Sequence, residues 1–304
     1  MNPTPLLDDY LLTLSGKASG TIDNYRRALA AFATWLSQLP GNHTSFHPDD
    51  FTRTAFHTYM AELERKGYSP SYRNIVKSAV GGFARWLIEE QGLLQRNPTR
   101  GVEIEAQALM APRVLTDEQR FVLKTLVERA NDVRGEALFA LGYWAGCRVS
   151  DVSHLKVDDV LLHERSGWLW VGYKGNKRRQ IDLNAQVREP LRAYLKSRLR
   201  QADSPYVFTS QRGDRLTEAG IHHWFRSVKA LARRDEWLYV TDLSYHDLRH
   251  DFAHRAREAG WTLEEVAFYL GHITKRGTPA VQTTVRYTQA SREQIKVKLK
   301  LVDG

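Results

Sequence analysis

Five side chains in the second half of the chain are of the types that can hold a phosphodiester and attack it. They are two arginines, Arg148 and Arg249, two histidines, His246 and His272, and one tyrosine, Tyr287. An arginine offers a phosphate a rigid fork of N–H donors and stays charged at any working pH. A histidine titrates near neutrality and can accept a proton. A phenol becomes a nucleophile once positive charge and a proton acceptor lower its pKa. Together these residues predict phosphoryl-transfer chemistry.

None of these residues carries that prediction alone. Arg148 with Asp151 three positions later also fits an ordinary ion pair on a helix surface. The three-residue spacing of His246 and Arg249 is a weak pattern in a chain with 11 histidines and 44 basic residues. A glycine before His272 is common at helix ends, and most of the 13 tyrosines must be packing residues. The hypothesis therefore depends on the whole set.

The first hundred residues have the periodicity of helices. Apolar residues recur at three- and four-residue steps over 21–36, which predicts an amphipathic helix. A second helical segment is expected over 47–63 and a third over 69–87, with Ser69 as its N-cap. Four cationic side chains fall on the faces opposite the apolar stripes, where they form either a solvated surface or a binding face: Arg26, Arg27, Arg73 and Lys77.

The rest of the chain indicates a second domain. Periodicity fails near residues 97–98, so we expect a helical domain over 1–106, a linker over 107–113 and a second domain over 114–304. Thr116 and Gln119 form a capping box for its first helix. Two strands are expected over 168–173 and 179–183, joined by a K-G-N-K-R hairpin. Further helices are expected over 138–145, from 150 towards 155, and over 187–200, 217–234, 245–259, 262–270 and 279–290, with a tail helix from Ser291.

Positive charge is concentrated in the second domain. The net charge is +9, and residues 1–113 hold 12 Lys and Arg against 11 Asp and Glu, whereas the remainder holds 32 against 24. A basic domain fits a polyanion, because each neutralised phosphate releases counterions, although many proteins are basic merely for solubility. The single cysteine, Cys147, excludes an intrachain disulfide and a cysteine metal cluster. With no signal peptide and no apolar run of about 20 residues, we expect a cytosolic protein without a structural metal.

The order of the motifs adds specificity that the single residues lack. The motifs, in chain order, are G-C-R-x-S-D at 146–151, K-G-N-K at 174–177, H-x-L-R-H at 246–250, L-G-H at 270–272 and T-T-x-x-Y-T at 283–288. With these motifs, the chain from Leu115 to Gln289 resembles the tyrosine recombinase family, which includes phage integrases and Xer-type resolvases, and the N-terminal part resembles that family's core-binding domain. The resemblance implies a mainly α fold, with a helical SAM-like domain and an α+β catalytic domain that contains a small β-sheet.

The resemblance also implies a role for each site residue, without metal or cofactor. Arg148 and Arg249 match the arginines that grip the scissile phosphate, and Asp151 matches the acidic position that supports the first. His246 matches a general base or phosphate contact, and His272 a third phosphate-binding position. Two further positions complete the set: Lys174 matches the lysine that protonates the leaving 5′ oxygen, and Tyr287 the nucleophile that forms a 3′-phosphotyrosyl bond.

Two departures from the family pattern leave alternatives open. About fifteen residues separate His272 from Tyr287, whereas the family more often has about nine, so Tyr269 is a second candidate nucleophile. The geometry of the hairpin is not readable from sequence, so three other cations are candidates for the role of Lys174 as proton donor: Lys177, Arg178 and Arg179.

The implied partner is double-stranded DNA with specific recombination sites, bound by a homotetramer on two sites. Accessory DNA-bending proteins fit this scheme, as does a cytoplasmic, nucleoid-associated location. The tail helix over 291–302 either docks on a neighbouring protomer or folds back on its own domain. Two rival functions are a type IB topoisomerase-like nicking enzyme and a non-catalytic DNA-binding regulator. Nine cations are candidate DNA contacts: Arg26, Arg27, Arg73, Lys77, Lys177, Arg178, Arg179, Lys275 and Arg276.

Overall fold

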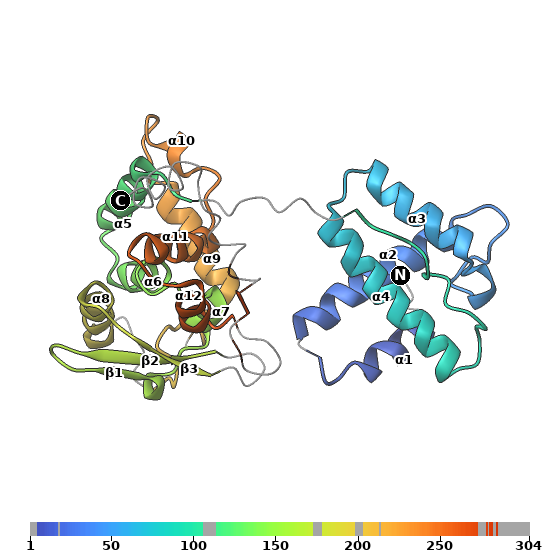
Figure 1. The fold of residues 1–304 in the computed structure, drawn as a ribbon, viewed down its shortest axis with the longest axis horizontal. Coiled ribbons are helices and arrows are strands. Elements are labelled where there is room, and N and C mark those ends of the chain that lie inside the picture. Colours follow the sequence, from blue (N-terminus) through green and yellow to red (C-terminus); the bar gives the residue numbers. More distant parts are fainter. Residues whose placement is uncertain are drawn as a thin grey trace, which may run out of the picture. The chain divides into compact units, whose positions relative to one another are not determined.

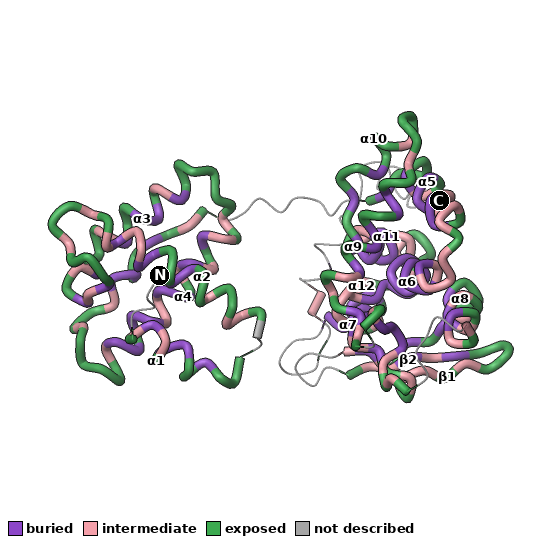
Figure 2. The backbone as a smooth tube through the Cα atoms, turned by 180° about the vertical axis from the view of Figure 1, so that it is seen from behind, coloured by how far each residue is buried: buried purple, intermediate pink, exposed green. Residues whose placement is uncertain are grey.

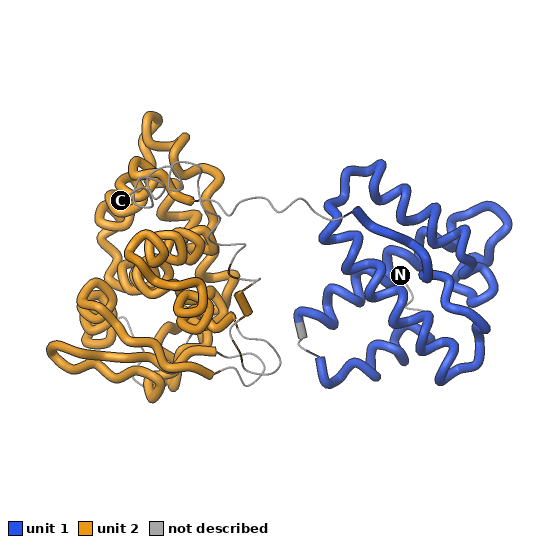
Figure 3. The backbone as a smooth tube through the Cα atoms, in the orientation of Figure 1, with its two compact units in different colours: residues 1–109 blue, residues 110–304 orange. Residues whose placement is uncertain are grey.

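The computed structural model divides into two compact units, residues 1–109 and 110–304 (Figure 3). It describes residues 5–17, 19–105, 114–172, 178–197, 203–212 and 214–272, and positions 278, 280, 281 and 284. The border between the units falls inside the segment 107–113, which the sequence indicates as a linker. Each unit has its own hydrophobic core, and each is therefore described separately. In the described ranges no helix is both long and apolar enough to cross a membrane.

The first unit is helical (Figure 1). Thr52 begins a new helix within the segment expected as one element over 47–63, because its hydroxyl accepts the N–H of Ala55. A short helix at the N-terminus was not expected from sequence, since its apolar stripe of Leu7, Tyr10 and Leu11 spans barely two turns. The elements are α1 (Pro5–Thr13), α2 (Ser19–Ser37), the 3₁₀ helix η1 (Pro48–Asp50), α3 (Arg53–Arg65) and α4 (Pro70–Glu89).

Two glycines in the middle of α4 allow other segments to approach its backbone. A Cβ atom on Gly81 would lie 2.9 Å from Thr99 Oγ1, and one on Gly82 would overlap the Tyr10 hydroxyl. Glycine inside a helix costs about 1 kcal/mol relative to alanine. Here it gives the space in which α1 and the segment after α4 pack against the helix. Ser69 caps α4 as predicted, its hydroxyl accepting the N–H of Tyr72.

The second unit combines helices with an antiparallel sheet of strand order β1-β2-β3 (Figure 1). The two expected strands are present as β2 (Gly167–Val171) and β3 (Arg179–Asp182), and the buried side chains of Leu169 and Ile181 face each other across them. The strand β1 (Val160–Leu162) is too short for a recognisable alternation in the sequence. The other elements are α5 (Asp117–Ala130), α6 (Val133–Tyr143), α7 (Val149–Ser153), η2 (Val157–Asp159), α8 (Ala185–Lys196), α9 (Glu218–Lys229), α10 (Trp237–Val240), α11 (Tyr245–Glu258) and α12 (Leu263–Leu270).

Helix α6 lies at the centre of this core, and Figure 2 shows it buried over most of its length. Residues of α6 contact α5, α8 and α11. Gly142 lets α11 approach closely, since a Cβ atom there would lie 2.9 Å from the ring of Tyr245. The Tyr245 hydroxyl also donates to the carbonyl of Leu138 at 2.6 Å. These contacts fix the start of α11, on which His246 and Arg249 lie.

Several sequence predictions for this unit are confirmed and others are corrected. The capping box of Thr116 and Gln119 is present. Helix α9 ends at Lys229 instead of 234, and the short α10 follows it. Lys229 is buried there, and its ammonium donates to the carbonyls of Thr241 and Leu243, which joins the end of α9 to the segment that follows α10. The hairpin tip, most of the helix expected over 279–290 and the tail helix lie outside the described residues.

Candidate active site

The centre of the site is the C-terminal end of α12, where three arginines from different elements converge. The last carbonyls of a helix have no intrahelical partner and carry the negative end of the helix dipole, so they can hold several positive charges close together. Three successive carbonyls each accept from one arginine: Tyr269 O from Arg179 Nε at 2.7 Å, Leu270 O from Arg249 Nη2 at 2.6 Å, and Gly271 O from Arg148 Nη2 at 3.4 Å.

Arg249 is the most deeply buried of these three arginines. Its side chain has no exposed surface, and besides Leu270 it donates to the carbonyl of Gly146 at 2.6 Å. Gly146 follows α6 with a φ of +59°, and a Cβ atom there would lie 2.6 Å from Phe252. A glycine is therefore required at the turn that presents this carbonyl to Arg249.

The imidazole of His272 is neutral and held in one tautomer. Burial, and then the positive charges of Arg249 and Arg148, lower its pKa to about 3. Its Nε2 lies 3.0 Å from Arg249 Nη2, and its Nδ1 lies 3.1 Å from Thr284 Oγ1. Because a guanidinium only donates, Nε2 must accept, and the proton must sit on Nδ1 and point to Thr284. The threonine in the T-T motif therefore orients this histidine, a role that sequence reasoning missed.

Arg148 is partly exposed. It precedes α7, and the carboxylate of Asp151 accepts its backbone N–H at 3.3 Å. The same carboxylate, which is 5% exposed, lies 3.6 Å from Arg179 Nη2. Asp151 thus supports Arg148 through the backbone and neutralises part of the charge of Arg179.

His246 occupies the first turn of α11, next to the cluster. Ser244 caps this helix, through its N–H and hydroxyl contacts with Asp247. Desolvation, and then the charge of Arg249, lower the pKa of His246. The imidazole is thus largely neutral at neutral pH and able to accept a proton. Its ring lies edge-on to that of His250, with 4.5 Å between the centroids.

Tyr269, the second candidate nucleophile, is a packing residue. Its ring stacks on Phe252 at 5.2 Å and lies edge-on to Trp261 at 5.2 Å. Burial raises the pKa of the phenol above its usual value. Ionisation of this side chain is therefore harder than that of a free phenol, which argues against nucleophilic attack by Tyr269.

Two of the hypothesised DNA contacts, Arg73 and Arg179, are paired with carboxylates inside their own unit. Arg73 is buried on α4 and pairs with Glu64 at 2.9 Å, so its charge is satisfied inside the unit. Arg179 is 11% exposed and is bonded within the cluster, so it is not an exposed contact or a free proton donor. The helical periodicity predicted that Arg73 lies on the helix now seen as α4, and the hairpin motif predicted that Arg179 begins a strand. Neither pattern revealed that these side chains are buried.

Apart from the half-buried Lys77, the other candidate contacts are exposed or lie outside the described residues. Arg26 is exposed and lies 3.9 Å from Asp8, and Arg27 is exposed and donates to Asn24. Arg178 is exposed and pairs with Asp159. Five of the predicted residues lie outside the described part of the chain: Lys174, Lys177, Lys275, Arg276 and Tyr287.

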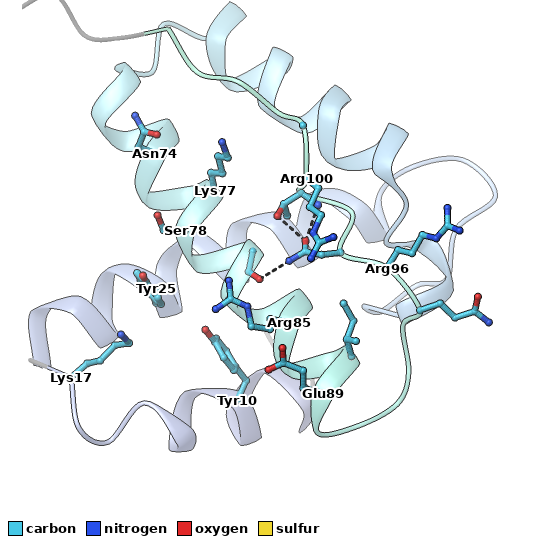
Figure 4. A pocket seen from close by; sticks show the side chains of 17 residues that line it. Tyr10, Lys17, Tyr25, Asn74, Lys77, Ser78, Arg85, Glu89, Arg96 and Arg100 are labelled. Atoms are coloured by element: carbon cyan, nitrogen blue, oxygen red, sulfur yellow. Dashed lines mark hydrogen bonds between the residues drawn. The ribbon is translucent and has the colours of Figure 1, made fainter.

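A basic groove in the first unit was missed by sequence reasoning, apart from Lys77. It has a volume of about 910 Å³ and lies between α4, the end of α1, α2 and the segment that follows α4 (Figure 4). Among its described lining residues, Glu89 is the only carboxylate. No described ion pair engages the cations of the groove. These cations are Lys17, Lys77, Arg85, Arg96 and Arg100.

Across the part of the chain that the structure describes, no three His, Cys, Asp or Glu side chains come together in a way that could hold a metal ion. The positive charge of the site is supplied by guanidinium groups instead. These groups donate hydrogen bonds in fixed directions, as a bound phosphate requires.

Two family models match the chain. The phage integrase family matches residues 113–294, and the N-terminal SAM-like domain of phage integrases matches residues 7–91. The chain is 30% identical over 293 residues to tyrosine recombinase XerC of Neisseria meningitidis, covering 95% of this chain and 92% of that protein. It is 28% identical over 304 residues to tyrosine recombinase XerA of Pyrococcus horikoshii, covering 96% and 92%.

Solved structures have the same fold. One is the XerH site-specific recombinase bound to a palindromic difH substrate, with a TM-score of 0.72 at 17% identity, covering 98% of this chain and 84% of that one. Another is a lambda integrase dimer bound to a core site, with a TM-score of 0.65 at 18% identity, covering 93% and 75%. The chain belongs to the phage integrase family. Within that family it is a site-specific tyrosine recombinase, as its relatives along nearly the whole length are.

Proposed function

We propose that the chain recombines double-stranded DNA at specific sites through a 3′-phosphotyrosyl intermediate formed by Tyr287. The convergence of Arg148, Arg249 and His272 at the end of α12 carries this proposal. In the reaction, the phenol of Tyr287 gives its proton to the neutral imidazole of His246, its oxygen forms a bond to phosphorus, and the bond from phosphorus to the 5′ oxygen breaks. The leaving oxygen takes a proton from Lys174. A 5′ hydroxyl from a second duplex then reverses the attack.

The arginine cluster suits the transition state of this transfer. Negative charge builds on the non-bridging oxygens of phosphorus, and preorganised donors stabilise it without having to reorient. Arg148 is partly exposed, and among the described residues its side chain is held by a long hydrogen bond of 3.4 Å to Gly271 O, so it can turn to a phosphate at little cost. Arg249 is fully covered in the chain without DNA. Its contact with phosphate therefore requires a local rearrangement when DNA binds.

The position of Thr284 supports Tyr287 as the nucleophile. Thr284 is buried and bonded to His272, and Tyr287 follows it by three residues. Three residues of extended chain span at most about 11 Å, so the cluster is within reach of the proposed nucleophile. The neighbouring cations would lower the pKa of its phenol.

The groove of the first unit is proposed to contact the DNA backbone. Five cations with one carboxylate line it, in a part of the chain whose net charge is close to zero. Its longest side chains, Arg85, Arg96 and Arg100, are exposed and can each reach a phosphate. Such contacts would supply affinity that depends on salt and not on sequence.

Replacing Arg85 and Arg100 together by glutamine should weaken DNA binding and flatten its salt dependence. Each phosphate contact that is lost reduces the slope of log K against log salt by about 1, so we expect a decrease of about 2. Fluorescence anisotropy over a salt series measures the slope. Arg65→Gln is the matched control, because Arg65 is exposed on α3 and does not line the groove. Equal slopes for the double variant and wild type would rule out the groove as a DNA contact.

Strand exchange between two duplexes needs four nucleophiles, so we propose a homotetramer assembled on two sites, acting on DNA in the cytoplasm. Accessory DNA-bending proteins are compatible with this assembly. The residues beyond 290 are proposed to link neighbouring protomers, with folding back on the same unit as the alternative.

A nicked suicide duplex tests the proposed function. DNA recovered with the protein from its source cell supplies the site, and a nick near the cleavage point lets the 5′ fragment diffuse away so that a covalent complex accumulates. We expect a protein–DNA adduct that survives denaturing electrophoresis and withstands chelation of metal ions. If no adduct forms on the DNA site recovered with the protein, the proposed cleavage activity is refuted. Relaxation of a supercoiled plasmid that lacks the site, without recombinant products, would favour a topoisomerase-like activity instead.

A further inference from the structure

Arg179 is the first residue of strand β3, and its side chain lies where three parts of the second unit meet. Its Nε donates to the carbonyl of Tyr269 at the end of α12, and its Nη2 lies 3.6 Å from the Asp151 carboxylate on α7. One rigid guanidinium therefore joins strand β3 to α7, the helix that follows Arg148, and to the end of α12, which precedes His272. These three segments are far apart in the sequence.

The burial of Arg179 makes these contacts necessary. A largely buried charge is tolerated only when it is paired and hydrogen-bonded. Asp151 supplies the counter-charge, and the carbonyl of Tyr269 supplies an acceptor at the negative end of α12. Desolvation lowers the pKa of Arg179 from its usual value, but an arginine stays charged at working pH. The guanidinium therefore stays charged, and it continues to link the carboxylate of Asp151 to the carbonyl of Tyr269.

Gly271 provides the space that this arrangement uses. Its φ of +67° is in the left-handed region, and an added Cβ atom would lie 2.6 Å from Arg179 Nη1 and 2.8 Å from its Cζ. The guanidinium of Arg179 thus occupies the space that a side chain at position 271 would need. Because Gly271 also offers its carbonyl to Arg148 and precedes His272, a shift of Arg179 is transmitted to both.

We infer that Arg179 is a positioning residue for strand cleavage: it locks the start of α7 to the end of α12, and thereby sets the spacing of Arg148 and His272, without touching DNA. The inference rests on the proposed phosphoryl-transfer site. It assigns Arg179 neither a phosphate contact nor the donation of a proton.

Arg179→Gln should slow cleavage and leave DNA binding intact. A displacement of about 1 Å at a catalytic group can cost up to about 100-fold in rate, so we expect a 10- to 100-fold lower rate of adduct formation at saturating DNA. The half-saturating DNA concentration and the salt slope should equal those of wild type. Arg192→Gln, at a partly exposed arginine on α8 paired with Glu189, is the control and should cleave at the wild-type rate. A defect confined to affinity or to the salt slope would overturn the inference.

Two readouts separate positioning from other roles. A substrate with sulfur in place of the 5′ bridging oxygen has a leaving group that needs no proton, so it would restore cleavage if Arg179 were the acid. We expect no restoration. In a double-mutant cycle, Arg179→Gln should have a much smaller effect on the rate in an Asp151→Asn background, because the pair acts as a unit. Restoration by sulfur, or fully additive effects, would contradict the inference.

The inference can fail separately from the proposed function. If the wild type forms no adduct, the proposed function fails, and the cycle is then measured on the stability of the protein without DNA by urea unfolding. Coupling between Arg179→Gln and Asp151→Asn would support the lock, and additivity would refute it. If the wild type forms the adduct and Arg179→Gln cleaves at the same rate, only the inference is lost.

Discussion

Tyr287→Phe should bind its DNA site with wild-type affinity and form no covalent adduct. Removing the phenolic oxygen removes the only atom proposed to bond to phosphorus, whereas the cations that hold the DNA stay in place. Loss of a nucleophile typically costs more than about 10³-fold in rate, so the adduct should fall below detection on the nicked duplex. Denaturing electrophoresis measures the adduct, and a gel shift measures binding.

Tyr269→Phe is the matched control. It removes a hydroxyl whose recorded contact is a long hydrogen bond of 3.4 Å to the carbonyl of Asp182, and it keeps the ring that stacks on Phe252. The backbone carbonyl that accepts from Arg179 is unaffected. The Tyr269→Phe adduct should therefore form. An adduct with Tyr287→Phe but none with Tyr269→Phe would reverse the assignment.

Asp251→Ala should destabilise the catalytic unit by about 3–5 kcal/mol, the usual cost of leaving buried charges without their partner. Asp251 has no exposed surface and accepts from Arg120 at 2.8 and 3.0 Å and from Arg255 at 2.8 Å. The carboxylate thereby joins α5 to α11. Arg255 also lies over the ring of Tyr143, 4.1 Å from its centroid, so the network extends to α6. Urea unfolding followed by circular dichroism measures the loss.

Asp117→Ala removes a second carboxylate from the same arginine and serves as the control. Asp117 pairs with Arg120 at 2.8 Å, but its side chain is 92% exposed. Exposed pairs contribute at most about 1 kcal/mol, so this variant should unfold close to wild type. If Asp117→Ala and Asp251→Ala lowered the free energy of unfolding by similar amounts, burial of the network would contribute nothing to stability.

The sequence predicted those parts of the fold that follow from local chemistry. The capping box at Thr116 and the serine cap and proline at the start of α4 depend on neighbouring residues, and both are present. The element η1 and the strand β1 are too short to leave a periodic signal. The other helices and two of the strands were predicted from periodicity, whereas the SAM-like and α+β domain types were predicted from the family resemblance of the motifs.

The sequence predicted which arginines and which histidine lie together better than it predicted how they are held. The motif order placed Arg148, Arg249 and His272 in one site, and the structure brings them together. Nothing in the sequence reveals that Arg179 is buried, because a basic hairpin is ordinarily exposed and the acceptor at Tyr269 is 90 residues away. The groove was missed because its cations come from separate segments that only packing unites.

The anchoring of three arginines on main-chain oxygens bears on how this protein can change during evolution. A substitution at position 269 or 270 alters a side chain but leaves the acceptor in place, so the anchor is robust to most point mutations. It is sensitive instead to insertions or deletions near the end of α12, which would rotate the oxygens away from their donors. Variation in length should therefore be tolerated after this turn more readily than within it.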